Sequence, residues 1–348
     1  MTKLYVFNPE HDLALASNLA NFTAPHAGRQ LRADLSYLPA LWAGPDDYVL
    51  VEHVELARRL YGRLRARVGG APAHFVDKRQ LSHIIINKVE PWGWDLALRS
   101  ALIRYGVSAD ACASEAEISL IRECSHRRQA AEVLRQMDWE VPFEATTVEA
   151  IRQRLSLSPR LVVKAPWSSS GRGVRFIDGE LTDNHRGWIS HAIQQQGSVM
   201  VEPYYPKVKD FAMEFEALPD GGIRYLGLSL FDTRNGAYTG NIIASEGDKM
   251  QMISHYVSVD LVNSVREKVT NALCDVIGRQ YTGPFGVDMM IVAKPDGNGF
   301  LVHPCVEINL RRTMGHVALT MATTSYSLQP RVMRISLSDK YRIHIQRL

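Results

Sequence analysis

Residues 306–311 read Val-Glu-Ile-Asn-Leu-Arg, and this stretch decides how the rest of the chain is interpreted. Apolar residues alternate with Glu307 and Asn309, which is the pattern of a β-strand. Residues two apart on a strand point to the same face, so Glu307 and Asn309 present two oxygen ligands together. Because a carboxylate among apolar strand residues needs a compensating cation, the stretch predicts a cation site.

The strand expected just before it, at 285–292, carries a further carboxylate, Asp288. Residues 295–299 read Pro-Asp-Gly-Asn-Gly, which is turn chemistry and joins that strand to the next one at 300–309. On such a hairpin Asp288 approaches the face that carries Glu307. Two carboxylates and an amide oxygen predict Mg²⁺, which proteins bind through few carboxylates together with substrate phosphates.

Upstream, a strand at 160–165 carries Lys164 near its end and leads into a loop of small residues. A lysine at the end of a buried strand is costly unless its ammonium meets an anion. The loop is neither a Walker A sequence nor a dinucleotide fingerprint. Its backbone N–H groups are nevertheless suited to close over phosphates, and its residues are Ser168, Ser169, Ser170, Gly171, Arg172 and Gly173.

Both signals also have an explanation that needs no ligand. A surface hairpin turn with a snorkelling lysine explains Lys164 and the loop that follows. A buried ion pair of Glu307 with Arg311 or Arg312 explains the acid in the last strand. The residues alone leave these alternatives open.

A third signal is the strand at 198–202, which ends in Glu202 and is followed by irregular backbone at Tyr204. A carboxylate and free peptide groups at this place suit the edge of an adenine ring, and Asp210 suits ribose hydroxyls. Acids at strand ends are usually only solvated, so Glu202 and Asp210 alone do not indicate a nucleotide site. They become informative because they follow the lysine strand and precede the Glu307–Asn309 strand along the chain.

In that order, over residues 125–324, the chain resembles the ATP-grasp superfamily. ATP-grasp proteins hold ATP between two α+β lobes and typically join a carboxylate to an amine through an acyl phosphate. The segment 307–311 looks most like its counterpart in biotin carboxylases and related ligases. The resemblance implies an ADP-forming, carbon–nitrogen bond-forming ligase with ATP and Mg²⁺ as cofactors.

The resemblance also implies how the nucleotide is held. Lys164 would contact the α- and β-phosphates, and the loop 168–173 would cover them. Glu202 and the backbone of Tyr204 would meet adenine, and Asp210 would meet the ribose.

The remaining implied roles concern the metal and the transferred group. Magnesium would be bound by Asp288, Glu307 and Asn309. Arg311 would stabilise the transferred phosphoryl group or the acyl intermediate, so Arg311 and Lys164 are the residues expected to be catalytic.

Two departures from the family pattern matter. Residues 125–128 read Ser-His-Arg-Arg where the family usually has Asp-Lys, so Arg127 or Arg128 would replace a phosphate-binding lysine. Gly286 stands where ligases of the D-alanine type carry an arginine, which argues against that subclass.

The first third alternates short strands with amphipathic helices, which predicts a small α/β domain with a parallel sheet. Its first strand runs into Asn8-Pro9-Glu10-His11-Asp12, where a loop would face the active site. The alternative is that Asn8 or Asp12 caps a following helix. Further candidate substrate residues are Asn8, Glu10, His11, Asp12, Asp232, Arg234 and Arg312, of which Asp232 and Arg234 lie in a loop expected over the substrate.

We therefore expect an α/β and α+β chain in which an N-terminal parallel-sheet α/β domain precedes a two-lobed ATP-grasp. The expected divisions are an N-terminal domain at 1–124, a central lobe at 125–202, a C-terminal lobe at 203–325 and a tail at 326–348. In the tail, the alternation at 341–345 predicts a solvated edge strand.

Composition limits the alternatives. The 348 residues include 40 Lys and Arg against 37 Asp and Glu, a balance that gives no reason to expect nucleic acid or a membrane surface as partner. The 4 cysteines form no CxxC pair, and no apolar run is long enough for a signal peptide or a membrane helix, so a cytoplasmic location is expected. Small-molecule substrates are the expected partners, and a homodimer is the commonest assembly for such an enzyme.

Two other functions remain compatible with these residues. A kinase of a small hydroxyl compound needs the same ATP site. A non-catalytic nucleotide-binding protein keeps the fold without the reaction.

Overall fold

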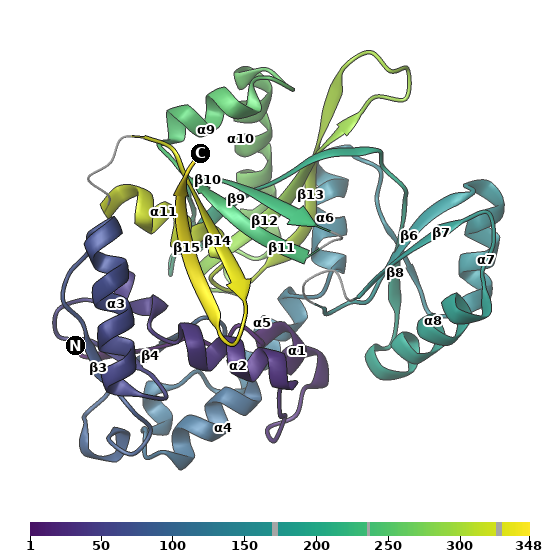
Figure 1. Ribbon diagram of the computed structural model, residues 1–348. Helices are drawn as coiled ribbons and strands as arrows, with labels where there is room; N and C mark the ends of the chain where they lie inside the picture. The colour runs from purple at the N-terminus through teal and green to yellow at the C-terminus, as the bar shows by residue number, and fades with distance from the viewer. Residues whose placement is uncertain (169–172, 235–236, 325–328) are drawn as a thin grey trace.

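The computed structural model describes residues 1–168, 173–234, 237–324 and 329–348. Three sheets divide these residues into an N-terminal domain, a central lobe and a C-terminal lobe (Figure 1). The first sheet is parallel and the other two are antiparallel. The expected class, a small parallel-sheet α/β domain followed by two lobes, is confirmed.

Parallel strands need long crossovers, and helices supply them in the N-terminal domain. The sheet has the order β3-β2-β1-β4. Its strands are β1 (Lys3–Val6), β2 (Tyr48–Leu50), β3 (His74–Val76) and β4 (Lys88–Pro91). The α-helices around it are α1 (His11–Ser17), α2 (His26–Leu35), α3 (Val54–Val68) and α4 (Leu96–Arg104).

Helix α3 has the bounds that the sequence predicts, and its buried face overlaps the expected one at Leu64. The spacing of Leu56, Leu60 and Leu64 predicts a leucine face. The structure buries Leu64 together with Ala57, Tyr61 and Val68, while Leu56 and Leu60 are half-buried. Tyr61 accounts for the difference, because its hydroxyl lies within hydrogen-bond distance of the carbonyls of Ala40, at 2.9 Å, and Ala71, at 2.8 Å, which holds the ring inward.

Helices α5 (Glu115–Cys124) and α6 (Arg128–Gln136) lead into the central lobe. Its sheet has the order β5-β8-β6-β7, so the predicted hairpin with the small-residue loop is β6-β7. The strands are β5 (Phe143–Ala145), β6 (Arg160–Lys164), β7 (Val174–Asp178) and β8 (Val199–Pro203), and the helices are α7 (Val148–Leu157) and α8 (Asp183–Gln196).

The C-terminal lobe is built on a sheet of the order β13-β12-β9-β10-β11-β14-β15. The strands are β9 (Lys207–Ala217), β10 (Ile223–Arg234), β11 (Ala237–Ile243), β12 (Gly283–Ala293), β13 (Phe300–Asn309), β14 (Arg331–Leu337) and β15 (Tyr341–Arg347). Its helices are α9 (Glu246–Ile253), α10 (Val259–Val276) and α11 (Met314–Thr324).

The segment expected as a separate tail is joined to this sheet. Strand β14 pairs with β11, and β15 follows it as the last strand in the order, which confirms the expected edge strand. Val332 and Met333 are buried, so apolar side chains hold β14 in place although the segment is rich in arginine.

The lobes differ in how their cores are made. The central lobe has a core of its own, with Ile151, Val163 and Ile189. The N-terminal domain and the C-terminal lobe have clusters of their own and also share one, in which Phe7 lies with Met321. No helix among the described residues is long and apolar enough to cross a membrane.

Candidate active site

The hairpin β12-β13 brings the predicted metal ligands together. Asp288 pairs directly with Glu307 in the strand register, and Asn309, two residues on, shares the face of Glu307. We call Asp288, Glu307 and Asn309 the carboxylate face. Burial, with Glu307 and Glu214 nearby, raises the pKa of Asp288 to about 7. The face therefore disfavours its own negative charge, as a cation site does before the cation binds.

Glu214 on the neighbouring strand β9 was not predicted from the sequence. It lies opposite Gly286 and is buried, and its Oε2 lies 3.0 Å from Nδ1 of His316. The available signal was the same as for Glu307, an acid inside the apolar strand around Phe215. Among the described residues no three His, Cys, Asp or Glu side chains form a metal cluster, so the candidate set is two carboxylates and an amide.

Arg127 connects the carboxylate face to the small-residue loop. Its Nη2 lies 2.7 Å from Glu307 Oε1, and its Nη1 donates to the carbonyl of Ala165 at 2.5 Å and to Ser168 Oγ at 2.8 Å. Glu307 thus has an arginine partner, but the partner is Arg127 and not Arg311 or Arg312, the two that the ion-pair interpretation named.

Arg128 lies outside this cluster. Its Nη2 donates to Glu144 at 3.0 Å, and about half of its side chain is exposed. Of the two arginines that the sequence left as alternatives, Arg127 is the one that touches the loop and the carboxylate face.

Gly173 closes the described end of the loop, and a larger residue would not fit there. A Cβ atom at this position would lie 2.2 Å from the Cβ and Oγ of Ser168. The carbonyl of Gly173 accepts a hydrogen bond from Ala165 at 2.8 Å, which keeps the two ends of the loop together. Four loop residues that were expected to cover phosphates lie outside the described residues: Ser169, Ser170, Gly171 and Arg172.

Lys164 and Glu202 face each other from neighbouring strands β6 and β8. Their side chains are buried and form an ion pair between Nζ and Oε1. The surface-lysine explanation for Lys164 is therefore wrong. The backbone N–H of Tyr204 donates to the carbonyl of Arg160 at 3.0 Å, so this N–H is already satisfied within the protein.

Asp210 and Asp232 lie on the adjacent strands β9 and β10. Asp210 Oδ2 accepts from Lys207 Nζ at 2.6 Å and from Thr233 Oγ1 at 2.8 Å, while Asp232 Oδ1 accepts from Lys209 Nζ at 2.6 Å. The side chain of Arg234 lies outside the described residues.

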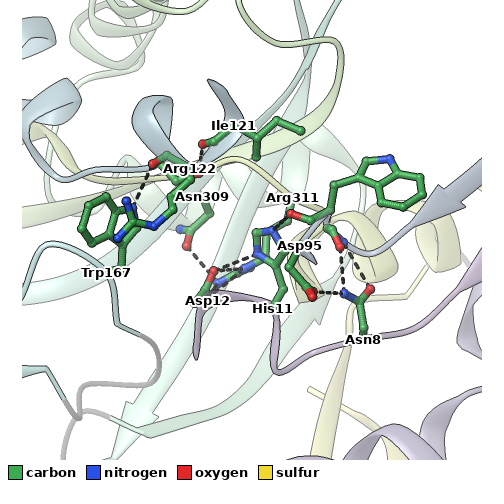
Figure 2. A network of polar contacts seen from close by, with 12 residues as sticks. Asn8, His11, Asp12, Asp95, Ile121, Arg122, Trp167, Asn309 and Arg311 are labelled. Carbon is green, nitrogen blue, oxygen red and sulfur yellow. Dashed lines mark hydrogen bonds and ion pairs between the residues drawn. The ribbon is translucent and has the colours of Figure 1, made fainter. Parts of the chain in front are cut away.

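Arg311 is held by a residue of the N-terminal domain (Figure 2). Its Nε and Nη2 donate to the two oxygens of Asp12, with Nε to Oδ1 at 2.9 Å and Nη2 to Oδ2 at 2.7 Å. Nη2 also donates to Asn309 Oδ1 at 2.9 Å, which places the guanidinium beside the carboxylate face. Burial opposes the charge of both groups, yet the pairing raises the pKa of Arg311 and lowers the pKa of Asp12.

Buried polar contacts fix the turn that presents Asp12. His11 contacts Asp12 Oδ1 through Nδ1 at 3.2 Å and the carbonyl of Trp94 through Nε2 at 3.0 Å. Asn8 donates to the carbonyl of Gly93 at 2.7 Å and to Asp95 Oδ2 at 3.1 Å. Gly93 is required here because a Cβ would lie 2.5 Å from the His11 ring.

The capping interpretation of this turn is wrong. Helix α1 starts after Glu10 and has no side-chain cap, since Asn8 is committed to the β4-α4 connection and Asp12 to Arg311. Sequence patterns did not reveal this, because the partners are far apart in the chain.

A second connection, also absent from the sequence predictions, lies beside the site. The indole of Trp167 donates to the carbonyl of Arg122 at 2.9 Å and lies 3.7 Å from its guanidinium carbon. Arg122 Nε donates to the carbonyl of Leu15 at 2.8 Å. The loop of the central lobe, α5 and α1 are thereby joined around the site (Figure 2).

Two of the candidate substrate residues point elsewhere. The guanidinium of Arg312 lies over the ring of Trp42, 4.7 Å from its centroid. Glu10 pairs with Arg32 and lines a cavity within the N-terminal domain.

The chain matches no protein-family model and no curated protein. Its fold is similar to solved structures of ATP-grasp proteins. Biotin carboxylase from Campylobacter jejuni in complex with β,γ-ATP has 11% identity and a TM-score of 0.51, covering 96% of this chain and 75% of that one. N5-carboxyaminoimidazole ribonucleotide synthetase from Thermus thermophilus has 12% identity and a TM-score of 0.51, covering 98% of this chain and 84% of that one. This chain has the ATP-grasp fold.

Proposed function

We propose that this chain is an ATP- and Mg²⁺-dependent, ADP-forming ligase that joins a carboxylate to an amine or another nucleophile through an acyl phosphate. One observation carries the proposal: Arg127 touches both Glu307 and Ser168, so the carboxylate face and the start of the small-residue loop form one site. Relatives of the same fold support it, since biotin carboxylase was solved with β,γ-ATP and a ribonucleotide synthetase of 11% identity and TM-score 0.50 with ADP.

The donor set fits Mg²⁺. Asp288, Glu307 and Asn309 offer hard oxygen ligands, and the pKa of Asp288 is raised by burial and by the neighbouring carboxylates of Glu307 and Glu214. When bound there, Mg²⁺ would neutralise charge on the phosphoryl oxygens during transfer.

The chain's own residues would hold the nucleotide. Arg127 and Lys164 bring positive charge to the start of the loop and to the end of β6, where phosphates would lie. Lys164 pairs with Glu202 in the free protein, so nucleotide binding would move this ammonium from a carboxylate to a phosphate. Glu202 would then be free for adenine, and Asp210 would take the ribose.

Arg311 would act on the transferred group. Asp12 and Asn309 hold its guanidinium before substrate arrives, and such pre-organised charge is most effective where negative charge develops in the transition state. The substrate carboxylate would attack the γ-phosphorus in line and release ADP. The nucleophile would then attack the acyl carbon and release phosphate.

The test is a product analysis with Mg·ATP and pools of small carboxylates and amines. The expected result is ADP and phosphate in equal amounts with a condensed product, and Glu307→Gln serves as the inactive control. AMP and pyrophosphate would contradict the acyl-phosphate route. A stable phosphorylated product would indicate a kinase, and ATP binding without turnover in every pool would indicate a non-catalytic nucleotide binder.

A further inference from the structure

A cavity of about 590 Å³ lies within the N-terminal domain, away from the residues proposed to bind ATP. It is bordered by the segments that follow β1, β2 and β3, and by α2 and α4. These are the carboxyl ends of parallel strands, the edge at which open α/β sheets bind ligands. Its volume is that of a small-molecule site.

The floor of this N-terminal cavity contains a buried carboxylate with one unsatisfied oxygen. Glu10 Oε1 accepts from Arg32 at 2.6 Å, but Oε2 has no hydrogen-bond partner among the residues that the structure describes, and the side chain is only 6% exposed. Asp95, also buried, lines the same floor. Two buried carboxylates against one arginine leave the floor short of positive charge, and burial raises the pKa of both acids.

The rim has the opposite character. Arg29, Lys78, Arg79 and Arg104 line it and are exposed, and within the described residues none of their side chains forms an ion pair. Two acids, Glu52 and Asp77, are the rim's negative groups. A ligand that reaches from floor to rim therefore meets negative charge first and positive charge last.

Helix α1 separates the cavity from the carboxylate face. Ala14 lines the cavity, whereas Asp12 and Leu15 line the crevice beside Glu307 and Asn309. A molecule in the cavity would thus be distinct from the nucleotide.

We propose that the N-terminal cavity binds a small molecule with a primary amine at one end and an anionic group, carboxylate or phosphate, at the other. The ammonium lies against the two buried carboxylates of the floor, Glu10 and Asp95, and the anion lies among the rim cations. The ligand class follows from the two charges and their order, and it does not depend on the ligase reaction.

The test uses isothermal titration calorimetry on the full chain at pH 7.5 without nucleotide. The probes are phosphoethanolamine and 4-aminobutyrate, which distinguish a phosphate from a carboxylate as the anion. Ethanolamine and inorganic phosphate are the one-ended controls. At least one two-ended probe should bind at least tenfold more tightly than either control, and equal or absent binding at 20 mM would overturn the proposal.

Variants locate the two ends. Glu10→Gln should weaken the two-ended probe at least tenfold, while Glu52→Gln, a rim acid, should leave binding equal or slightly tighter. The double variant Arg29→Gln, Arg79→Gln should also weaken binding of the two-ended probe. Because both arginines are exposed, this variant should fold normally and keeps the test valid if Glu10→Gln does not fold. Unchanged binding in a folded Glu10→Gln protein or in the double variant would refute the assignment.

A competition experiment separates this site from the proposed nucleotide site. Saturating Mg·ATP should leave probe binding in place. Displacement of the probe by Mg·ATP would put it in the nucleotide site and overturn the inference, whereas failure of the ligase assay would leave these measurements unaffected.

Discussion

The carboxylate face and the floor of the N-terminal cavity both bury acids, yet they receive their positive charge in different ways. At the carboxylate face, Arg127 arrives from the start of α6 and Arg311 is held by Asp12 of the N-terminal domain. The floor is built within one domain, where, in the described part of the chain, Arg32 is the one ion-pair partner of Glu10. The face is therefore a product of the whole assembly. Substitutions there should lower turnover or, at Asp12, the stability of the domain contact, whereas the floor should respond mainly in ligand binding.

The largest expected effect is on turnover at the carboxylate face. Glu307→Gln keeps the shape but removes one charge, and loss of about 3–4 kcal/mol of transition-state stabilisation lowers turnover about 10²- to 10³-fold. The melting temperature should change little, because losing the Arg127 pair is offset by relief of the repulsion with Asp288. Normal ADP formation by this variant would rule out the proposed metal site.

The next effect is on the link between domains. Asp12→Asn leaves the Arg311 guanidinium buried beside a neutral group, which should cost about 3 kcal/mol of unfolding free energy. Urea denaturation measures this loss of unfolding free energy. The control is Glu149→Gln, which removes an exposed ion pair with Arg152 and should cost less than about 1 kcal/mol. Equal losses in the two variants would mean that the Asp12 pair is no stronger than a surface contact.

A pH series examines the charge of the face itself. The pKa of Asp288 is raised from its ordinary 3.8 to about 7, so between these values the folded protein holds a proton that the unfolded chain does not. Without metal, stability contributed by this group is complete below about pH 4 and is lost as the pH rises through 7. Asp288→Asn should therefore melt higher than the unmodified chain at pH 8, and the difference should shrink toward pH 4. A difference that grows on acidification would reverse the argument.

The smallest effect distinguishes the neighbouring arginines. Arg128→Ala removes a half-exposed pair with Glu144 and should change stability by less than about 1 kcal/mol and leave ATP affinity unchanged. Arg127→Ala should weaken ATP binding at least tenfold, because it removes a cation from the start of the phosphate loop. Equal behaviour of both variants in an ATP titration would remove Arg127 from the proposed site.

Local patterning was sufficient for much of the fold. The apolar alternation predicts the strand at 300–309 with the bounds of β13, and the turn chemistry at 295–299 predicts its pairing with β12. The shared face of Glu307 and Asn309 follows from the two-residue repeat of any strand. These features depend on neighbours in the chain or one hairpin away, so the sequence alone determined them.

Other features depend on long-range contacts, which periodicity cannot report. Asp12 and Arg311 stand 299 residues apart, and only the packing of the N-terminal domain on the C-terminal lobe makes them partners. The tertiary structure also decides which of Arg127 and Arg128 meets Glu307. Adjacent residues at a helix start point in different directions, and only the surrounding elements determine which of them faces that carboxylate. The sequence alone determined which charged groups lie on the strands, and the tertiary structure decided which of them meet, because a buried charge is tolerated only where the fold supplies its partner.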